Sequence, residues 1–232
     1  MSCGRQAPAL VPEGYDAGED TEHFLEYSAS KYEAEHRMVH ELPGLPLVVA
    51  RPSIVVGHTR LGCKPSGSIY WVFRIARALQ AFPCELDQCV DVIPVDYCAQ
   101  VLEYLINAPV LRYRNYHISA GTQRACRFGE IDAAIAKAVG AMPMKNYRAI
   151  PFDQIALMQN QFPTVLGPCN RRLVLRAIRA YGELAKLGMI FDNSRLLAEG
   201  IDLAPRFSDY VGLCELTSAG TLIADQMKFD YK

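Results

Sequence analysis

The sequence of 232 residues contains no apolar run long enough to span a membrane, and no basic start followed by an apolar stretch. Its most apolar segment, LPLVVARPSIVVG, is interrupted by Arg51 and Pro52 and is far shorter than the roughly 20 residues that a spanning helix needs. The opening residues, MSCGRQAPALVPEGYDAGED, have none of the features of a secretory signal. We therefore expect a protein with no membrane span and a cytoplasmic location.

The sequence also lacks an excess of either charge, because 24 basic residues face 25 acidic ones and the formal net charge is -1. This balance gives no electrostatic reason to expect nucleic acid or an anionic membrane as a partner, and it suits a small-molecule substrate better. Eight cysteines are present, but no two form a CxxC pair and no histidine stands at a ligand spacing from them. We expect no metal site and mostly buried, reduced thiols.

Helical and extended patterns alternate along the first two thirds of the chain. A Gly- and Pro-free stretch rich in Ala, Glu and Lys predicts the first helix, and a β-branched run without alternation predicts a strand buried on both faces. The expected order is a helix over 24–42, a strand within 45–57, a helix within 66–82, a strand and then a helix within 89–109, a strand within 115–121 and a helix over 128–140.

Three polar residues in these segments carry separate expectations. Ser66 or Ser68 is placed to cap the second helix, and Asp96 is placed to cap the third. Arg51 stands inside the apolar run, where a charge needs a partner or an anionic ligand.

The alternation predicts an α/β fold in which right-handed crossovers build a mostly parallel sheet covered by helices. Only about three strands are visible in the sequence, too few for a complete doubly wound domain. Strand signals fade beyond Pro151, so the rest of the chain is expected to be rich in α-helix.

Tyr27 and Lys31 lie four positions apart in the first predicted helix, so their side chains share one face. A free tyrosine has a pKa of about 10, and a cation within a few ångströms makes a neighbouring acid stronger by roughly 1–3 pKa units. Such a pair is suited to passing a proton. The same spacing also arises by chance in a chain with 12 tyrosines, in which case the two residues merely share a helix surface.

The segment that follows this pair has the order of motifs of a known family. YSASKYEAEHRMVHELPGLPLVVARPSIVVG combines YxxxK, a following AE, a Leu-Pro-rich turn and RPSIVVG. It resembles the tyrosine-to-strand block of the extended short-chain dehydrogenase/reductases, particularly the fatty acyl-CoA reductase and thioester reductase branch. VDVIPVDYCAQVL, NYHISAG and MIFDNSRLLAEG are similar to later segments of that pattern. The resemblance covers residues 1 to about 120 well and the remainder loosely.

This resemblance implies the C-terminal part of a Rossmann-like parallel sheet, with residues 1–150 as a partial domain carrying YxxxK and residues 151–232 as an α-helical substrate or cap region. It implies that Tyr27 gives a proton to a carbonyl oxygen as hydride arrives. Lys31 would bind the nicotinamide ribose and make the Tyr27 hydroxyl a stronger acid, and Pro52, Ser53 and Val55 would lie against the nicotinamide. The implied cofactor is NADP, or else NAD, and the implied substrate is an acyl thioester or another carbonyl compound.

The sequence departs from the family in two places. No GxxGxxG turn is present, although family members use such a turn and a helix N-terminus to hold the pyrophosphate. The family's catalytic serine or threonine would fall upstream of Met1 in its usual register, and Ser2 stands 25 residues before Tyr27.

We therefore expect catalysis only within a longer or two-chain enzyme, with an N-terminal half as a separate chain or with a homo-oligomer. The strand over 47–56 should then have an open edge and an apolar patch. Two alternatives stay open: a nucleotide-sugar or sterol epimerase/dehydrogenase fragment, and a non-catalytic binding or assembly fragment that acts through its helical tail.

Overall fold

The computed structural model describes residues 4–5, 7–18, 21–23, 26–64 and 66–230. Nearly half of these residues are helical. The helices are α1 (Glu26–Glu41), α2 (Tyr70–Leu79), α3 (Val95–Asn107), α4 (Gly121–Arg124), α5 (Phe128–Ala138), α6 (Phe152–Leu157), α7 (Phe162–Leu166), α8 (Arg171–Lys186), α9 (Ser194–Ala198), α10 (Phe207–Ser218) and α11 (Ile223–Asp230), with one 3-10 turn, η1 (Gln159–Gln161).

The strands are short and pair mostly in parallel. They are β1 (Leu10–Val11), β2 (Val49–Pro52), β3 (Ile54–Val55), β4 (Ala81–Phe82), β5 (Cys89–Val90), β6 (Val92–Ile93), β7 (Asn115–Ile118), β8 (Cys126–Arg127), β9 (Arg148–Ala149) and β10 (Ile190–Phe191). The parallel pairs are β1 with β10, β2 with β7, β3 with β6 and β4 with β9, while β5 and β8 are antiparallel. The predicted α/β fold with parallel strands is confirmed.

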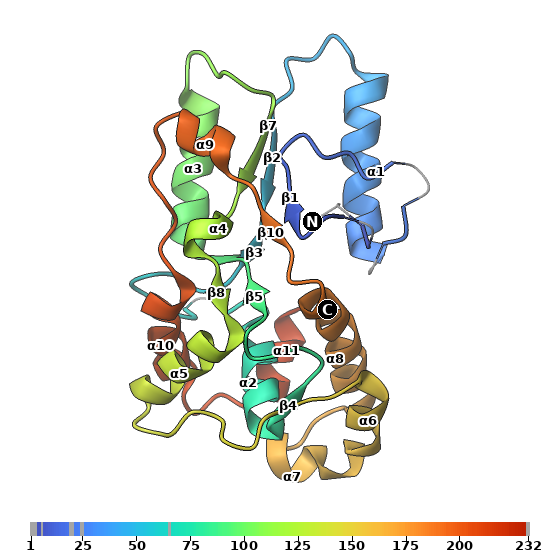
Figure 1. Ribbon diagram of the computed structural model, residues 1–232, viewed down its shortest axis with the longest axis vertical. Coiled ribbons are helices and arrows are strands. Elements are labelled where there is room, and N and C mark those ends of the chain that lie inside the picture. Colours follow the sequence, from blue (N-terminus) through green and yellow to red (C-terminus); the bar gives the residue numbers. More distant parts are fainter. Residues whose placement is uncertain (1–3, 6, 19–20, 24–25, 65, 231–232) are drawn as a thin grey trace.

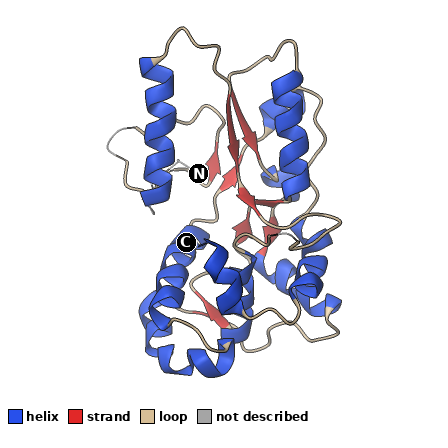
Figure 2. Ribbon diagram, turned by 180° about the vertical axis from the view of Figure 1, so that it is seen from behind, coloured by secondary structure: helices blue, strands red, loops and turns tan. Residues whose placement is uncertain are grey.

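The strand expected within 45–57 is divided into β2 and β3 at Ser53. The backbone N–H of Ser53 still donates to the Ile118 carbonyl, 2.9 Å away, whereas that of Ile54 donates to the Asp91 carbonyl at 3.3 Å. The chain thus changes partner from β7 to β6 within one residue. In Figures 1 and 2, α1 lies on one side of β2 and β7, α3 and α9 lie on the other, and the opposite end of the molecule is mainly helical.

The apolar core lies away from α1. The largest cluster surrounds α2, whose Tyr70, Trp71 and Phe73 are all buried, and a second cluster joins α3 to β7. In α1 the one buried side chain among the described residues is that of Ser28. Polar contacts therefore carry much of the attachment of α1 to the sheet.

Both predicted helix caps are wrong. Helix α2 begins after Ile69 with no side-chain cap, and the Ser66 hydroxyl instead accepts the backbone N–H of Ser68. Helix α3 begins after Pro94, and Asp96 accepts hydrogen bonds from the backbone N–H and the hydroxyl of Thr59. Asp96 thus holds the loop after β3 rather than its own helix. No helix in the described part of the chain has the length and apolar character needed to cross a membrane.

Candidate functional site

Tyr27 and Lys31 lie in the first two turns of α1, on the same face of the helix. Helix α1 forms where the sequence is free of Gly and Pro, and it ends before Pro43 and Gly44. The Lys31 Nζ atom lies over the Tyr27 ring, 5.2 Å from its centroid. Tyr27 is 63% exposed, so much of its side chain is open to a ligand. The expected i, i+4 contact of the two side chains is therefore present.

All five residues that the family resemblance singles out line one cavity of about 720 Å³. It lies between α1, the β2–β3 segment and α8. Tyr27 and Lys31 line it from α1, and the β2–β3 segment contributes the remaining three, Pro52, Ser53 and Val55. Residues far apart in the sequence are thus gathered around one space large enough for a small molecule. Ser2, the serine nearest the family's catalytic position, lies outside the described residues.

The cavity is also lined by residues that the sequence did not mark as site residues. Tyr181, Leu184 and Met189, in and just after α8, form an apolar wall of the cavity. Tyr181 and Leu184 lie where the sequence shows only helical periodicity, which does not indicate a place at the site, whereas Met189 opens the family-like segment MIFDNSRLLAEG.

Arg51 joins α1 to the sheet. Its Nε donates to Glu35 Oε2 at 2.9 Å and its second terminal nitrogen pairs with Glu35 Oε1, which makes a bidentate contact. Its Nη1 donates to the Glu13 carbonyl at 3.0 Å. The charge of Arg51 in an apolar strand is therefore paired with the carboxylate of Glu35, one helical turn beyond Lys31. This contact sets the position of the Tyr27–Lys31 face over β2.

Asp91 lies buried between β5 and β6, with only 2% of its surface exposed. Its two carboxylate oxygens accept the backbone N–H groups of Ala120 and Phe191, at 2.8 and 3.0 Å. Burial raises the pKa of Asp91 to about 6, and these donors oppose that rise. One carboxyl group thereby ties the ends of β6, β7 and β10 together behind the β2–β3 segment.

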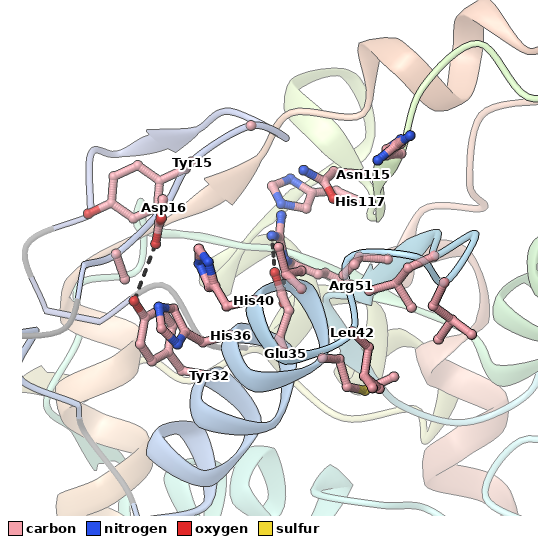
Figure 3. A pocket seen from close by; sticks show the side chains of 18 of the residues that line it. Tyr15, Asp16, Tyr32, Glu35, His36, His40, Leu42, Arg51, Asn115 and His117 are labelled. Carbon is pink, nitrogen blue, oxygen red and sulfur yellow. Dashed lines mark hydrogen bonds and ion pairs between the residues drawn. The ribbon is translucent and has the colours of Figure 1, made fainter.

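A second pocket, of about 320 Å³, lies between α1 and the face of β2 and β7 (Figure 3). Tyr32, His36 and His40 project into it from α1, and the Tyr32 hydroxyl donates to Asp16 at 3.4 Å. His117 lines the pocket from β7, and burial lowers its pKa to about 4, so it is neutral at pH 7. None of the five predicted site residues lines this pocket.

The edge of β2 opposite β7 is open in the described part of the chain, where β2 pairs with β7 alone. Every residue from Leu47 to Val55 lines the large cavity. Because successive side chains of a strand point to opposite faces, a run of consecutive lining residues means that the strand presents its edge to the cavity. Exposed apolar side chains, those of Leu42, Leu45 and Val48, lie nearby. The open edge and the apolar surface expected for this strand are both present.

Comparison with known proteins supports the resemblance to a family of NAD-binding proteins. Residues 11–102 match a model of NAD-binding domains described as male sterility protein. The chain is also 25% identical over 103 residues to the non-canonical nonribosomal peptide synthetase FrzA of Cladobotryum sp, a match that takes in 44% of this chain and 10% of that protein. The chain thus corresponds to a small part of this relative.

Two solved structures show the fold. The terminal R domain from the myxalamid PKS-NRPS biosynthetic pathway superposes with a TM-score of 0.63 and 23% identity, over 97% of this chain and 57% of that domain. The structure of gox2253 gives a TM-score of 0.55 and 18% identity, over 94% of this chain and 62% of that one. The matched segment, the parallel α/β fold and these likenesses together confirm the resemblance of the chain to the extended short-chain dehydrogenase/reductases, in the thioester reductase-like branch.

Proposed function

We propose that this chain supplies the proton-relay and substrate-binding part of a nicotinamide-dependent oxidoreductase that reduces an acyl thioester or another carbonyl compound. The observation that carries the proposal is the single cavity of about 720 Å³ lined by Tyr27, Lys31, Pro52, Ser53 and Val55. The match to an NAD-binding family supports a nicotinamide cofactor, and we take NADP as the form used, with NAD as the alternative.

The residues of the cavity fit the nicotinamide riboside end of such a cofactor. Lys31 offers an ammonium group and Ser28 and Ser53 offer hydroxyls for a ribose, while Ile54 and Val55 provide an apolar surface for a flat ring. When bound, the cofactor supplies the hydride. Tyr27 would donate its hydroxyl proton to the carbonyl oxygen of the substrate, and Lys31 would hold positive charge beside the phenol as that proton leaves.

The described residues around the cavity offer no comparable site for the pyrophosphate. Such a group is normally held by a glycine-rich turn and a helix N-terminus, and the sequence has no GxxGxxG. We infer that a second segment, in the same polypeptide, in a separate chain or in a second copy, completes the cofactor site. The open edge of β2 offers the backbone groups with which a strand of that segment would pair.

The first experiment uses the chain as it is. Nicotinamide mononucleotide contains the riboside end without the rest of the dinucleotide, so it should give saturation-transfer NMR signals with the purified chain. Tyr27→Phe should leave this binding unchanged. If nicotinamide mononucleotide does not bind at millimolar concentration, the cavity is not a cofactor site, and a non-catalytic binding or assembly role becomes the better account.

The second experiment tests the relay. The chain is combined with the part of the myxalamid R domain that it does not span, and NADPH oxidation is followed with an acyl thioester. Tyr27→Phe should lower turnover by about 100- to 10,000-fold, because the proton donor is removed. Tyr32→Phe is the matched control, since Tyr32 lies on the same helix but lines the other pocket. Equal turnover in all three proteins would refute the role of Tyr27.

A further inference from the structure

A small apolar cavity adjoins the large one. It has a volume of about 50 Å³ and is lined by residues of α2, α5 and α8 and of the strands β3, β4, β5 and β10. The two cavities have five lining residues in common, which are Ile54, Ile69, Tyr181, Leu184 and Met189. The two spaces therefore adjoin along these side chains.

The interior of the small cavity is aromatic and aliphatic. Phe73 and Phe82 are buried and both stack on Phe128, with ring centroids 6.0 and 6.4 Å apart. Asp91 also lines the cavity, but its two carboxylate oxygens are engaged by the backbone N–H groups of Ala120 and Phe191. The lining therefore offers a guest apolar contact and little hydrogen bonding, which favours an apolar group over a polar one.

We propose that this cavity is a subsite for the apolar end of the carbonyl substrate, an inference that rests on the proposed function of the large cavity. An apolar recess next to a cavity large enough for a small molecule is a place where the apolar part of that molecule can be buried. A substrate whose carbonyl lies near Tyr27 would extend along Ile54 and Leu184, which line both spaces, and its terminal carbons would enter the small cavity.

The size of the cavity limits the substrate. Since roughly 10–15 Å³ of such space holds one water-sized group, about four methyl or methylene groups fit. Each methylene that enters should strengthen binding about fourfold, and longer chains should gain nothing more. The subsite thus favours short aliphatic acyl groups over acetyl and gives no further preference for longer chains.

The test measures binding of S-acyl-N-acetylcysteamine thioesters to the purified chain, with acetyl, butanoyl, hexanoyl and octanoyl groups. No cofactor or turnover is involved, so the outcome is independent of the hydride-transfer experiments. Affinity should rise from acetyl to hexanoyl and then level off. Equal affinity for all four thioesters, or no binding of any, would overturn the proposal.

Two alanines on α8 provide matched variants. Ala185 lines only the small cavity of the two, and Ala180 lines only the large one. Ala185→Leu should remove the gain from acetyl to hexanoyl, while Ala180→Leu should weaken all four thioesters alike and keep the gain. Thermal unfolding shows whether each variant folds, and Val90→Ile, which adds one methyl group to the same small cavity, replaces Ala185→Leu if that variant does not fold. A gain that survives filling of the small cavity would contradict the assignment.

Discussion

The ammonium group of Lys31 lies over the face of the Tyr27 ring, with Nζ 5.2 Å from the ring centroid. A cation–π contact of this kind contributes about 0.5–1 kcal/mol where both groups are exposed. Tyr27 is 63% exposed, and the contact joins two residues of one helix. The pair therefore contributes little to folding, and its arrangement places a positive charge beside a phenol that a ligand can reach.

Lys31→Met should separate the contribution of Lys31 to stability from its contribution to ligand binding. The free energy of unfolding should fall by less than about 1 kcal/mol, because only the exposed cation–π contact is lost. Affinity for nicotinamide mononucleotide should fall about tenfold, because the ammonium group that would bind the ribose is removed. Urea denaturation and saturation-transfer NMR measure the two quantities, with Lys31→Arg as the control that keeps a charge over the ring. A large loss of stability with unchanged binding would show that the pair is structural.

Arg51→Met should destabilise the attachment of α1. The substitution keeps the aliphatic stem but leaves the Glu35 carboxylate and the Glu13 carbonyl without their donor. Since the two side chains of the pair are only 16% and 23% exposed, we expect the free energy of unfolding to fall by about 2 kcal/mol. Urea denaturation measures the change.

Arg37→Met is the matched control for Arg51→Met. Arg37 pairs with Glu41 on the solvent side of the same helix, where the two side chains are 61% and 60% exposed. Surface pairs of this kind contribute little, so no measurable change in stability is expected. Similar losses in the two variants would mean that the Arg51–Glu35 contact does not anchor α1.

Sequence reasoning found the elements whose signal is local. Helix α1 follows from a stretch without Gly or Pro, and the parallel α/β class follows from the alternation of elements. The division of the central strand at Ser53 has no local signal, because it arises where the strand changes partner from Ile118 to Asp91. Strand β10 was missed for a similar reason: its two residues become a strand only by pairing with β1, 180 positions earlier.

The candidate site was predictable only where a motif marked it. Tyr27, Lys31 and Pro52 belong to a recognisable order of residues, and the structure brings them to one cavity. Tyr181 lines the same cavity, yet its neighbours in the sequence give no clue, because the tertiary packing of α8 places it there. Met189, which opens the family-like segment MIFDNSRLLAEG, lines it as well. Asp91 stands in an apolar run as Arg51 does, and the same argument about buried charge would have marked it.

Asp91 should give the protein a pH-dependent stability. Its pKa in the folded protein is about 6, above the ordinary value of 3.8, because burial disfavours the charged form. Folding therefore favours the protonated form, and the stability that Asp91 contributes is complete below about pH 4 and is lost as the pH rises through 6. The difference of about two pKa units corresponds to roughly 3 kcal/mol.

Asp91→Asn isolates this contribution, since the other titrating groups are common to both proteins. Unfolding free energies of the two proteins are compared by urea denaturation between pH 4 and pH 7.5. The stability of the wild-type protein relative to the variant should decrease by about 2.5 kcal/mol over this range. The variant should itself be less stable at pH 4, because the hydroxyl oxygen of the protonated carboxyl group can still accept one of the N–H groups of Ala120 and Phe191, whereas the NH2 group of an amide cannot. A difference that does not vary with pH would contradict the raised pKa.

Gly57 ends the RPSIVVG motif at a position that excludes a side chain for two separate reasons. Its φ is +66°, in the left-handed region, and a Cβ atom there would lie 2.5 Å from the Sγ of Cys214. Its carbonyl accepts the N–H of Val95 at 2.8 Å, so the turn also fixes the start of α3. Gly57→Ala should therefore lower the free energy of unfolding by about 3 kcal/mol or more, from backbone strain plus overlap.

Two further variants separate the backbone strain at Gly57 from the overlap with Cys214. Gly140 has a φ of +64°, and a Cβ atom added there would have open space around it to 4 Å, so Gly140→Ala should cost only the backbone strain, about 1 kcal/mol. Cys214→Ala removes the sulfur, so Gly57→Ala should cost less in a Cys214→Ala background than in the wild-type chain, and the double-mutant cycle gives the coupling. If Gly57→Ala and Gly140→Ala cost the same, the contact with α10 plays no part, and the glycine is required by its backbone angle alone.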